Sequence, residues 1–207
     1  MLEHLHLCIY HQIERGDVEI DAPNLKSFCF QGILRSICFE NTSLIEEIGI
    51  TLDEESAVEA FQELEGNLIE FFSRVSSIKR LRLNGGFLQL LSKGEVPQKL
   101  SNGLSHLTFL QLSHLDFPCK AELSCALCLI RSSPNLRSLH IIRPIIMDIH
   151  DVLAAPRYLK EQKKIGLTFS QLEYVKIDGF SGIEPELRFV KLILSAAIRL
   201  EEIGDHV

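Results

Sequence analysis

The stretch SPNLRSLHII, from Ser133 to Ile142, carries the pattern that decides the fold. Its residues Leu136, Leu139 and Ile141 follow the spacing leucine, two residues, leucine, one residue, leucine, which fits neither one helix face nor a simple alternating strand. The pattern returns in the rows Leu2-Leu5-Leu7, Leu25-Phe28-Phe30, Leu34-Ile37-Phe39, Ile45-Ile48-Ile50, Ile78-Leu81-Leu83, Leu107-Leu110-Leu112, Leu172-Val175-Ile177 and the partial Leu200-Ile203. Recurrence on this scale predicts a stacked array of similar units.

Each row is interpreted as one short strand. Its second and third apolar residues point inward, and its first residue is buried where the strand begins. A single strand of this kind cannot bury its apolar face alone, so neighbouring copies stack into a parallel sheet and the rest of each unit returns along the outer side. The row at Leu34 begins only nine residues after the row at Leu25. One of these two rows is therefore expected to be a return segment or a cramped repeat.

Helical spacing predicts four helices between the rows. The acidic run Asp53-Glu54-Glu55 suits the N-terminus of the first helix, and Pro185 suits the first turn of the last one. The apolar residues that mark the helices are Val58, Phe61, Leu68, Phe72 and Val75; Leu123, Leu127 and Ile130; Ile149, Val152 and Leu153; and Leu187, Val190, Leu194 and Ala197.

Alternating strands and helices predict an α/β leucine-rich-repeat solenoid, with parallel strands on the concave side and helices on the convex side. The rival architecture is a doubly wound α/β domain, which also alternates strands and helices. That fold would need long apolar strands and a Gly-rich first turn, and the sequence has neither.

Composition limits the classes of function. The 207 residues are 46% hydrophobic and carry a net charge of −7, which disfavours general binding of nucleic acid because phosphate contacts need an excess of Lys and Arg. No apolar run approaches the roughly 20 residues of a membrane-spanning helix, and no secretory signal follows Met1. The six cysteines are expected to be reduced, whereas a secreted receptor ectodomain would need them oxidised. These features favour a cytoplasmic or nuclear location and no membrane partner.

The C-terminal stretch SQLEYVKIDGFSGIEPELRFVKLILSAAIRLEEI, from Ser170 to Ile203, resembles the FBD module of plant F-box proteins. The family pattern is an LxxVxIxGFxG strand and turn, an acidic helix start, an FVKxxL helix and a closing LExx strand. It is matched here by Leu172, Val175, Ile177, Gly179, Phe180, Gly182, Glu186, Leu187, Phe189, Val190, Lys191, Leu194, Ala197, Leu200, Glu201 and Ile203. Upstream, APNLKSFCFQG at 22–32 and SSPNLRSLHI at 132–141 are similar to the irregular leucine-rich repeats of the same F-box/FBD/LRR-repeat family.

The resemblance implies irregular leucine-rich repeats over residues 1–165 and an FBD-like C-terminal module over 166–207 that continues the array. It also implies a protein-interaction module, the substrate-recognition part of an F-box subunit of a cullin-RING (SCF-type) ubiquitin ligase. Such a subunit holds a protein substrate on the concave face and a Skp-type adaptor through an N-terminal F-box. The LPxxLL start of an F-box is missing from this sequence. We therefore expect a C-terminal part of a longer protein or a truncated product; the alternative function is a stand-alone leucine-rich-repeat scaffold.

In a leucine-rich row the third, fifth and seventh positions face the concave side, where a protein partner can bind. Arginine and aromatic side chains there supply many binding hot spots, and the basic members of the set would steer an acidic target segment. Each polar residue taken alone is better explained as the ordinary surface of a solvated sheet, so the hypothesis of a binding face rests on the set. The candidate partner-binding residues are Arg80, Arg82, Asn84, Phe109, Gln111, Ser138, His140, Tyr174, Lys176 and Asp178.

No catalytic residue is predicted, because the sequence holds neither a G-x-S-x-G elbow nor a G-x-x-x-x-G-K phosphate loop. The C-x-x-C formed by Cys125 and Cys128 is interpreted as a pair of buried helix cysteines rather than half of a zinc site. The chain is therefore predicted to be a non-enzyme without a metal or cofactor. The weak metal candidate that remains is the set His4, His6, Cys8 and His11.

Overall fold

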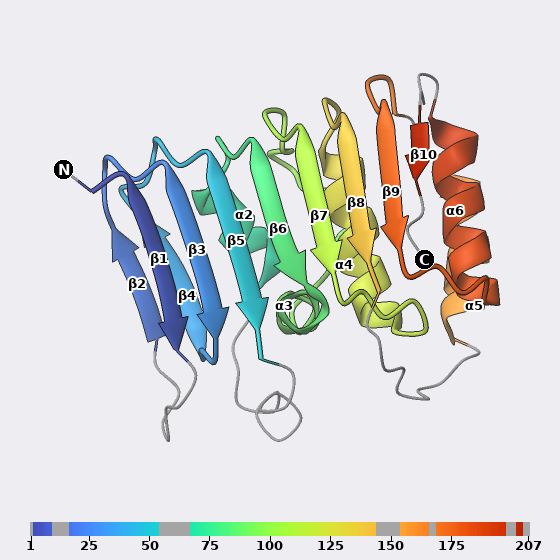
Figure 1. Cartoon of the computed structure of the whole chain (residues 1–207), viewed down its shortest axis with the longest axis horizontal. Coiled ribbons are helices and arrows are strands. Elements are labelled where there is room, and N and C mark those ends of the chain that lie inside the picture. Colours follow the sequence, from blue (N-terminus) through green and yellow to red (C-terminus); the bar gives the residue numbers. More distant parts are fainter. Residues whose placement is uncertain are drawn as a thin grey trace.

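The computed structural model describes residues 2–9, 17–53, 67–143, 154–165, 169–197 and 202–204. Its main feature is a parallel sheet of eight strands that lie side by side in chain order (Figure 1). A doubly wound sheet reverses its strand order at a switch point, and the order of the described strands has no such reversal. The predicted α/β organisation with a parallel sheet is therefore confirmed. The strands are β1 (His4–Ile9), β3 (Ser27–Gly32), β5 (Glu47–Leu52), β6 (Arg80–Asn84), β7 (Phe109–Ser113), β8 (Ser138–Ile142), β9 (Tyr174–Asp178) and β10 (Glu202–Gly204).

The register of this sheet stacks equivalent residues of successive rows on one another. Leu110 of β7 pairs with Leu81 of β6 and with Leu139 of β8, and all three side chains are fully buried. From β3 to β9 the third residues of the rows, such as Leu112, are buried in the same way, and so are the first residues, such as Leu107. The first row differs, because Leu2 is 52% exposed and Leu5 and Leu7 are only partly buried. The prediction that each row points its apolar residues inward is confirmed for the strands from β3 to β9.

A pair of hydrogen bonds joins the start of each strand to the strand before it. The amides of Thr108 and Phe109 both donate to the carbonyl of Lys79, at 2.9 and 3.2 Å. One row later, the amides of Arg137 and Ser138 both donate to the carbonyl of Thr108, at 2.9 and 3.0 Å. The same paired donation recurs at the start of every strand of the large sheet from β3 to β9. Each of these strands is thereby held in one register against the strand before it.

The first two rows return through a second sheet instead of a helix. In it, β2 (Asp17–Asp21) and β4 (Ser36–Glu40) pair in parallel. Phe39 of β4 packs edge to face against Phe28 of β3, with ring centroids 5.3 Å apart, so the small sheet covers the same side of the large sheet as the core. The row that begins at Leu34 is therefore the return segment that its short spacing predicted.

Helices return the later rows. Figure 1 shows α2 and α4 behind the sheet, so the core lies between the sheet and the helices. The prediction of α4 is confirmed, since Leu123, Leu127 and Ile130 are all buried. Neither α3 nor α5 was predicted, and the expected short helix around residues 149–153 lies outside the described residues. The helices are α2 (Leu68–Arg74), α3 (Gly85–Leu91), α4 (Lys120–Ser132), α5 (Ala154–Ile165) and α6 (Glu184–Ala196).

The predicted apolar face of α6 is only half right: Val190 and Ala197 pack against the core, but the other two residues do not. Leu187 and Leu194, expected in the core, are each 41% exposed. The helix buries Phe189 and Ile193 instead, and the Phe189 ring lies 5.3 Å from that of Phe117. Because α6 carries apolar residues on two sides, helical spacing alone selects either of them.

The first predicted helix is described only in its second half. Leu68, Phe72 and Val75 are buried in and beside α2, as predicted, whereas Val58 and Phe61 lie outside the described residues.

Two buried glutamates hold the loops that lead into the longest helices. Glu122, the third residue of α4, accepts the amide of Asp116 at 2.8 Å. Glu186, the third residue of α6, accepts the amide of Gly182 at 2.7 Å and pairs with Arg143 at 2.5 Å. A carboxylate in the first turn of a helix is favoured by the helix dipole. These side chains therefore fix where each helix begins relative to the preceding strand.

Gly32, the last residue of β3, is expected to tolerate no side chain. Its φ is +136°, and an added Cβ would fall on the carbonyl oxygen of Ile9. Replacing Gly32 with alanine should lower the free energy of unfolding by about 3 kcal/mol or more, because an overpacking cost of about 1–3 kcal/mol adds to backbone strain of about 1–2 kcal/mol. Urea denaturation measures the loss.

The matched control is Gly182→Ala. Gly182 also has a positive φ, +76°, but no described atom lies within 4 Å of an added Cβ. This variant should lose only the strain of about 1–2 kcal/mol. Equal losses in the two variants would contradict the close approach of Gly32 to β1.

Candidate partner-binding face

The surface of the large sheet that faces away from the helices is formed by the alternate residues of β6 to β9, since side chains along a strand point to opposite sides. The parallel register sets Arg82, Gln111 and His140 next to one another across three strands. The structure brings together every predicted site residue except Asn84. We call this surface the open face; its half-buried members are Arg80, Arg82, Phe109, Gln111, Ser113, Ser138, His140, Ile142, Tyr174, Lys176 and Asp178.

An aromatic ring, two arginines and one carboxylate form the first cluster on the open face. The guanidinium carbons of Arg80 and Arg82 lie 4.3 and 5.5 Å from the centre of the Phe109 ring. Glu47 of β5 lies 3.4 Å from Arg80 and 3.7 Å from Arg82. Exposed contacts of these kinds each stabilise a structure by up to about 1 kcal/mol. They therefore favour one orientation of each arginine side chain without fixing it.

Glu47 was missed by the sequence analysis. Its position was nevertheless readable, because it is the third residue of the row that begins at Ile45. The ion pairs that it makes with two arginines of the next strand depend on the register of β5 and β6, which pairs Glu47 with Arg80.

A second cluster joins β8 and β9. One carboxylate oxygen of Asp178 accepts a hydrogen bond from the Lys176 ammonium at 2.9 Å, and Nε2 of His140 lies 2.7 Å from the same oxygen. These contacts lower the pKa of Asp178 below its ordinary value, the hydrogen bond from Lys176 contributing most and that from His140 less. All three side chains are about one-fifth exposed. The ionised carboxylate thereby fixes the orientation of the histidine and the lysine.

Asn84 does not belong to the open face, contrary to the sequence prediction. Its side chain is fully buried. The amide oxygen accepts the backbone N–H of Leu52 at 3.0 Å, and the amide nitrogen donates to the Leu52 carbonyl at 2.7 Å. The same oxygen accepts the N–H of Phe87 at 3.2 Å and so caps α3. Asn84 is the last residue of β6, and α3 begins directly after it at Gly85, so its side chain caps the helix instead of facing outward.

The early rows carry the histidines and a cysteine considered as a metal candidate. His4, His6 and Cys8 are exposed on β1, with Nε2 of His6 3.5 Å from the Cys8 sulfur. His11 lies outside the described residues. Within the described part of the chain, no three metal-ligating side chains are grouped to hold an ion.

The C-x-x-C pair lies inside the core. Cys125 and Cys128 are free thiols on α4 and are buried, as predicted. Burial raises the pKa of Cys128 to about 11 and raises that of Cys125 as well. Nucleophilic attack and metal binding both require the thiolate, so these two side chains act as small apolar core residues.

Comparison with known proteins agrees with the sequence pattern. The chain is 28% identical over 208 residues to an F-box/FBD/LRR-repeat protein from Arabidopsis thaliana, a match that covers 98% of this chain and 48% of the relative. The predicted resemblance to that family is thus confirmed. The chain spans about half the length of the curated relative. No family model and no solved structure matches it, and none of the described helices has the length and apolar character needed to cross a membrane.

The Asp178 cluster predicts a pH dependence of stability. Because the folded-state pKa of Asp178 is lowered, its ionised form contributes stability above the unfolded-state value of about 3.9, and this contribution is lost as the pH falls through the folded-state pKa. The variant Asp178→Asn should be less stable than wild type near neutral pH. The difference between the two proteins should shrink as the pH falls from about 5 to about 2. Urea denaturation across that range measures it, and a constant difference would contradict the proposed pairing.

Proposed function

We propose that the rows form a leucine-rich-repeat array, with repeats over residues 1–165 and an FBD-like module over 166–207 continuing them, and that the open face binds a protein. In this role the chain is the substrate-recognition part of an F-box subunit of a cullin-RING (SCF-type) ubiquitin ligase. The observation that carries the proposal is the similarity, across nearly the whole chain, to a protein named for its F-box, FBD and leucine-rich repeats. The stacking of one row on the next supports the array.

The composition of the open face suits a protein target. Neighbouring strands lie about 4.8 Å apart, so β6 to β9 offer a surface about 14 Å across from side chains alone. Phe109 of β7 and Tyr174 of β9 lie on either side of Ser138 of β8 in the register of the sheet, and Arg80 of β6 is stacked on Phe109. Aromatic and arginine side chains of this kind dominate the binding energy of many interfaces. The smaller polar residues between them supply hydrogen bonds.

The charge of the open face favours an acidic target segment. The protein as a whole has a net charge of −7. On this face, however, Arg80, Arg82 and Lys176 outnumber the two carboxylates with which they pair, Glu47 and Asp178. The excess positive charge would raise the rate of encounter with an acidic segment, and a target carboxylate could replace Glu47 at the two arginines.

The ligase activity itself is assigned to partner subunits. A Skp-type adaptor would bind through an F-box, whose LPxxLL start is not found in these 207 residues. The proposal therefore includes neither catalysis nor a cofactor for this chain, and neither a nucleic-acid nor a membrane partner. A cytoplasmic or nuclear location belongs to the same proposal.

Reversing the charge of the open face should abolish capture of the target. The variant Arg80→Glu, Arg82→Glu and Lys176→Glu places three carboxylates where the target is expected to contribute its own. Affinity capture from plant extract, followed by quantitative mass spectrometry, should show at least one protein reduced about tenfold or more relative to wild type. Thermal unfolding of the variant verifies that it is folded.

The matched control reverses three cations on the helix side, with Arg157→Glu, Lys160→Glu and Lys191→Glu. These residues are exposed on α5 and α6, and the control makes the same change in net charge. It should capture the target as well as wild type does. If both variants lose the same proteins, or neither loses any, the open face is not the binding surface.

A further inference from the structure

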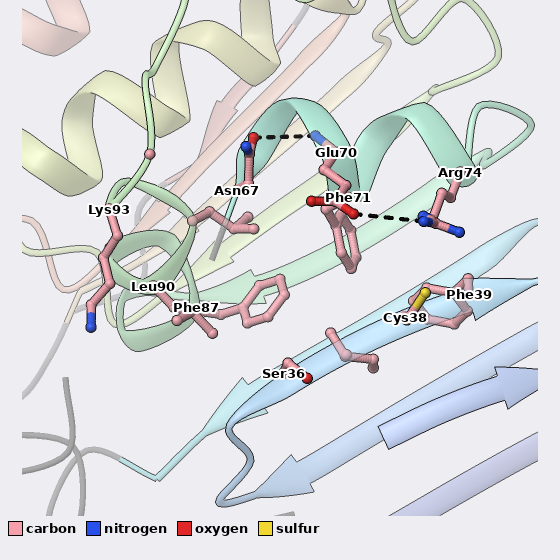
Figure 2. Close-up of a pocket in the computed structure, with 13 residues that line it drawn as sticks. Ser36, Cys38, Phe39, Asn67, Glu70, Phe71, Arg74, Phe87, Leu90 and Lys93 are labelled. Atoms are coloured by element: carbon pink, nitrogen blue, oxygen red, sulfur yellow. Dashed lines mark hydrogen bonds and ion pairs between the residues drawn. The ribbon is translucent and has the colours of Figure 1, made fainter. Parts of the chain in front are cut away.

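A groove of about 490 Å³ lies on the helix side of the molecule, away from the open face. Its volume falls within the range of about 300–1,000 Å³ typical of ligand sites. Figure 2 shows its three walls: strand β4, helix α2, and the second half of α3 with the turn that carries Lys93. The groove therefore lies where the small sheet ends and the helical returns begin.

Strand β4 presents its edge to this groove. Ser36, Ile37, Cys38 and Phe39 are consecutive, and all four line it. Since successive side chains point to opposite faces of a sheet, four residues in a row line one groove only when the strand meets it edge-on. Within the described residues, β4 is paired only with β2. An unpaired strand edge is a template for pairing with another extended chain.

The floor of the groove is apolar and aromatic. The ring of Phe71 packs against those of Phe39 and Phe87, with centroids 5.8 and 5.4 Å apart. Figure 2 shows the Phe71 ring extending from α2 and the Phe87 ring from α3, both on the groove side of β4. Leu90 and Leu91 of α3 extend the apolar wall. The polar rim consists of Asn67, Glu70, Arg74 and Lys93.

We propose that the edge of β4 binds an extended segment of a partner protein, which adds a third strand to the small sheet. The backbone N–H and C=O groups along this edge identify the occupant, because an extended polypeptide offers the matching row of donors and acceptors. A small apolar molecule would fill the floor but leave those backbone groups without partners.

The position of β4 also sets the side chains that the segment needs. In β4, Phe39 points to the core, against Phe28, while Cys38 points to the other side. An added strand shares this alternation, so every second side chain would enter the aromatic floor. Apolar residues are therefore required at alternate positions. On the rim, Arg74 pairs with Glu70 at 3.6 Å and with Glu40 at 3.8 Å, so uncharged polar residues fit between the apolar ones.

This inference is independent of the proposed target site. The groove and the open face lie on opposite sides of the large sheet, and they share no residue. Charge reversal at Arg80, Arg82 and Lys176 should leave the groove unchanged.

The test uses the half-buried thiol of Cys38 as a reporter and the exposed thiol of Cys8 as the internal control. The probes are acetylated and amidated heptapeptides with Val, Leu or Phe at positions 2, 4 and 6 and Ser or Thr elsewhere. Iodoacetamide labelling of the intact protein is followed by mass spectrometry. A peptide present at ten times its Kd should slow alkylation of Cys38 about tenfold, in proportion to occupancy, and leave Cys8 unaffected.

Matched peptides and variants complete the experiment. Peptides of the same composition with their apolar residues in one block should not protect Cys38. Cys38→Lys, which places a charge on the strand edge, should weaken peptide binding about tenfold or more, whereas Cys8→Lys should not. Both variants should unfold at the temperature of wild type.

Three results would overturn the proposal: no protection of Cys38 by any alternating peptide, protection by an apolar dye alone, or a Cys38 that is already unreactive because another segment of this chain covers it.

Discussion

The paired amide hydrogen bonds at the start of the strands of the large sheet from β3 to β9 are the constraint on which the rest of the structure depends. Two successive N–H groups, such as those of Arg137 and Ser138, converge on one carbonyl of the preceding row. This arrangement permits only one register, because a slip of one residue would turn the buried leucines outward. From β3 to β9, the buried first residue of each row, such as Leu136, holds the start of its strand against the core. The order of side chains across the open face follows directly.

The segments that connect the strands are less constrained, because they have only to cover the side of the large sheet on which the core lies. A two-stranded sheet does this for the first rows and helices do it for the later ones. The connections are then fixed individually, by Asn84 at α3, Glu122 at α4 and Glu186 at α6. This division explains why the rows are regular in the sequence while the distances between them are not.

The strands were predictable for this reason, and several helices were not. The spacing of Leu136, Leu139 and Ile141 reports a local requirement that each row meets separately. By contrast, α3 has seven residues and begins with two glycines, so its helical pattern is too short to recognise. The register that brings Glu47 to Arg80, and the buried position of Asn84, are properties of neighbouring rows. They become visible only when the rows are stacked.

The open face and the groove on the helix side offer different groups to a partner, because different elements form the two sides of the molecule. On the open face every strand has neighbours, so only side chains remain available, and the arginines there are already oriented by Phe109 and Glu47. On the other side, the segments that connect the rows are strands up to β4 and helices from α2 onward. A helix has no free row of backbone groups with which to continue a ladder, since its N–H and C=O groups bond within the helix. Among the described residues, β4 therefore keeps an open edge beside an aromatic wall, and the same irregularity that breaks the repeat creates the groove.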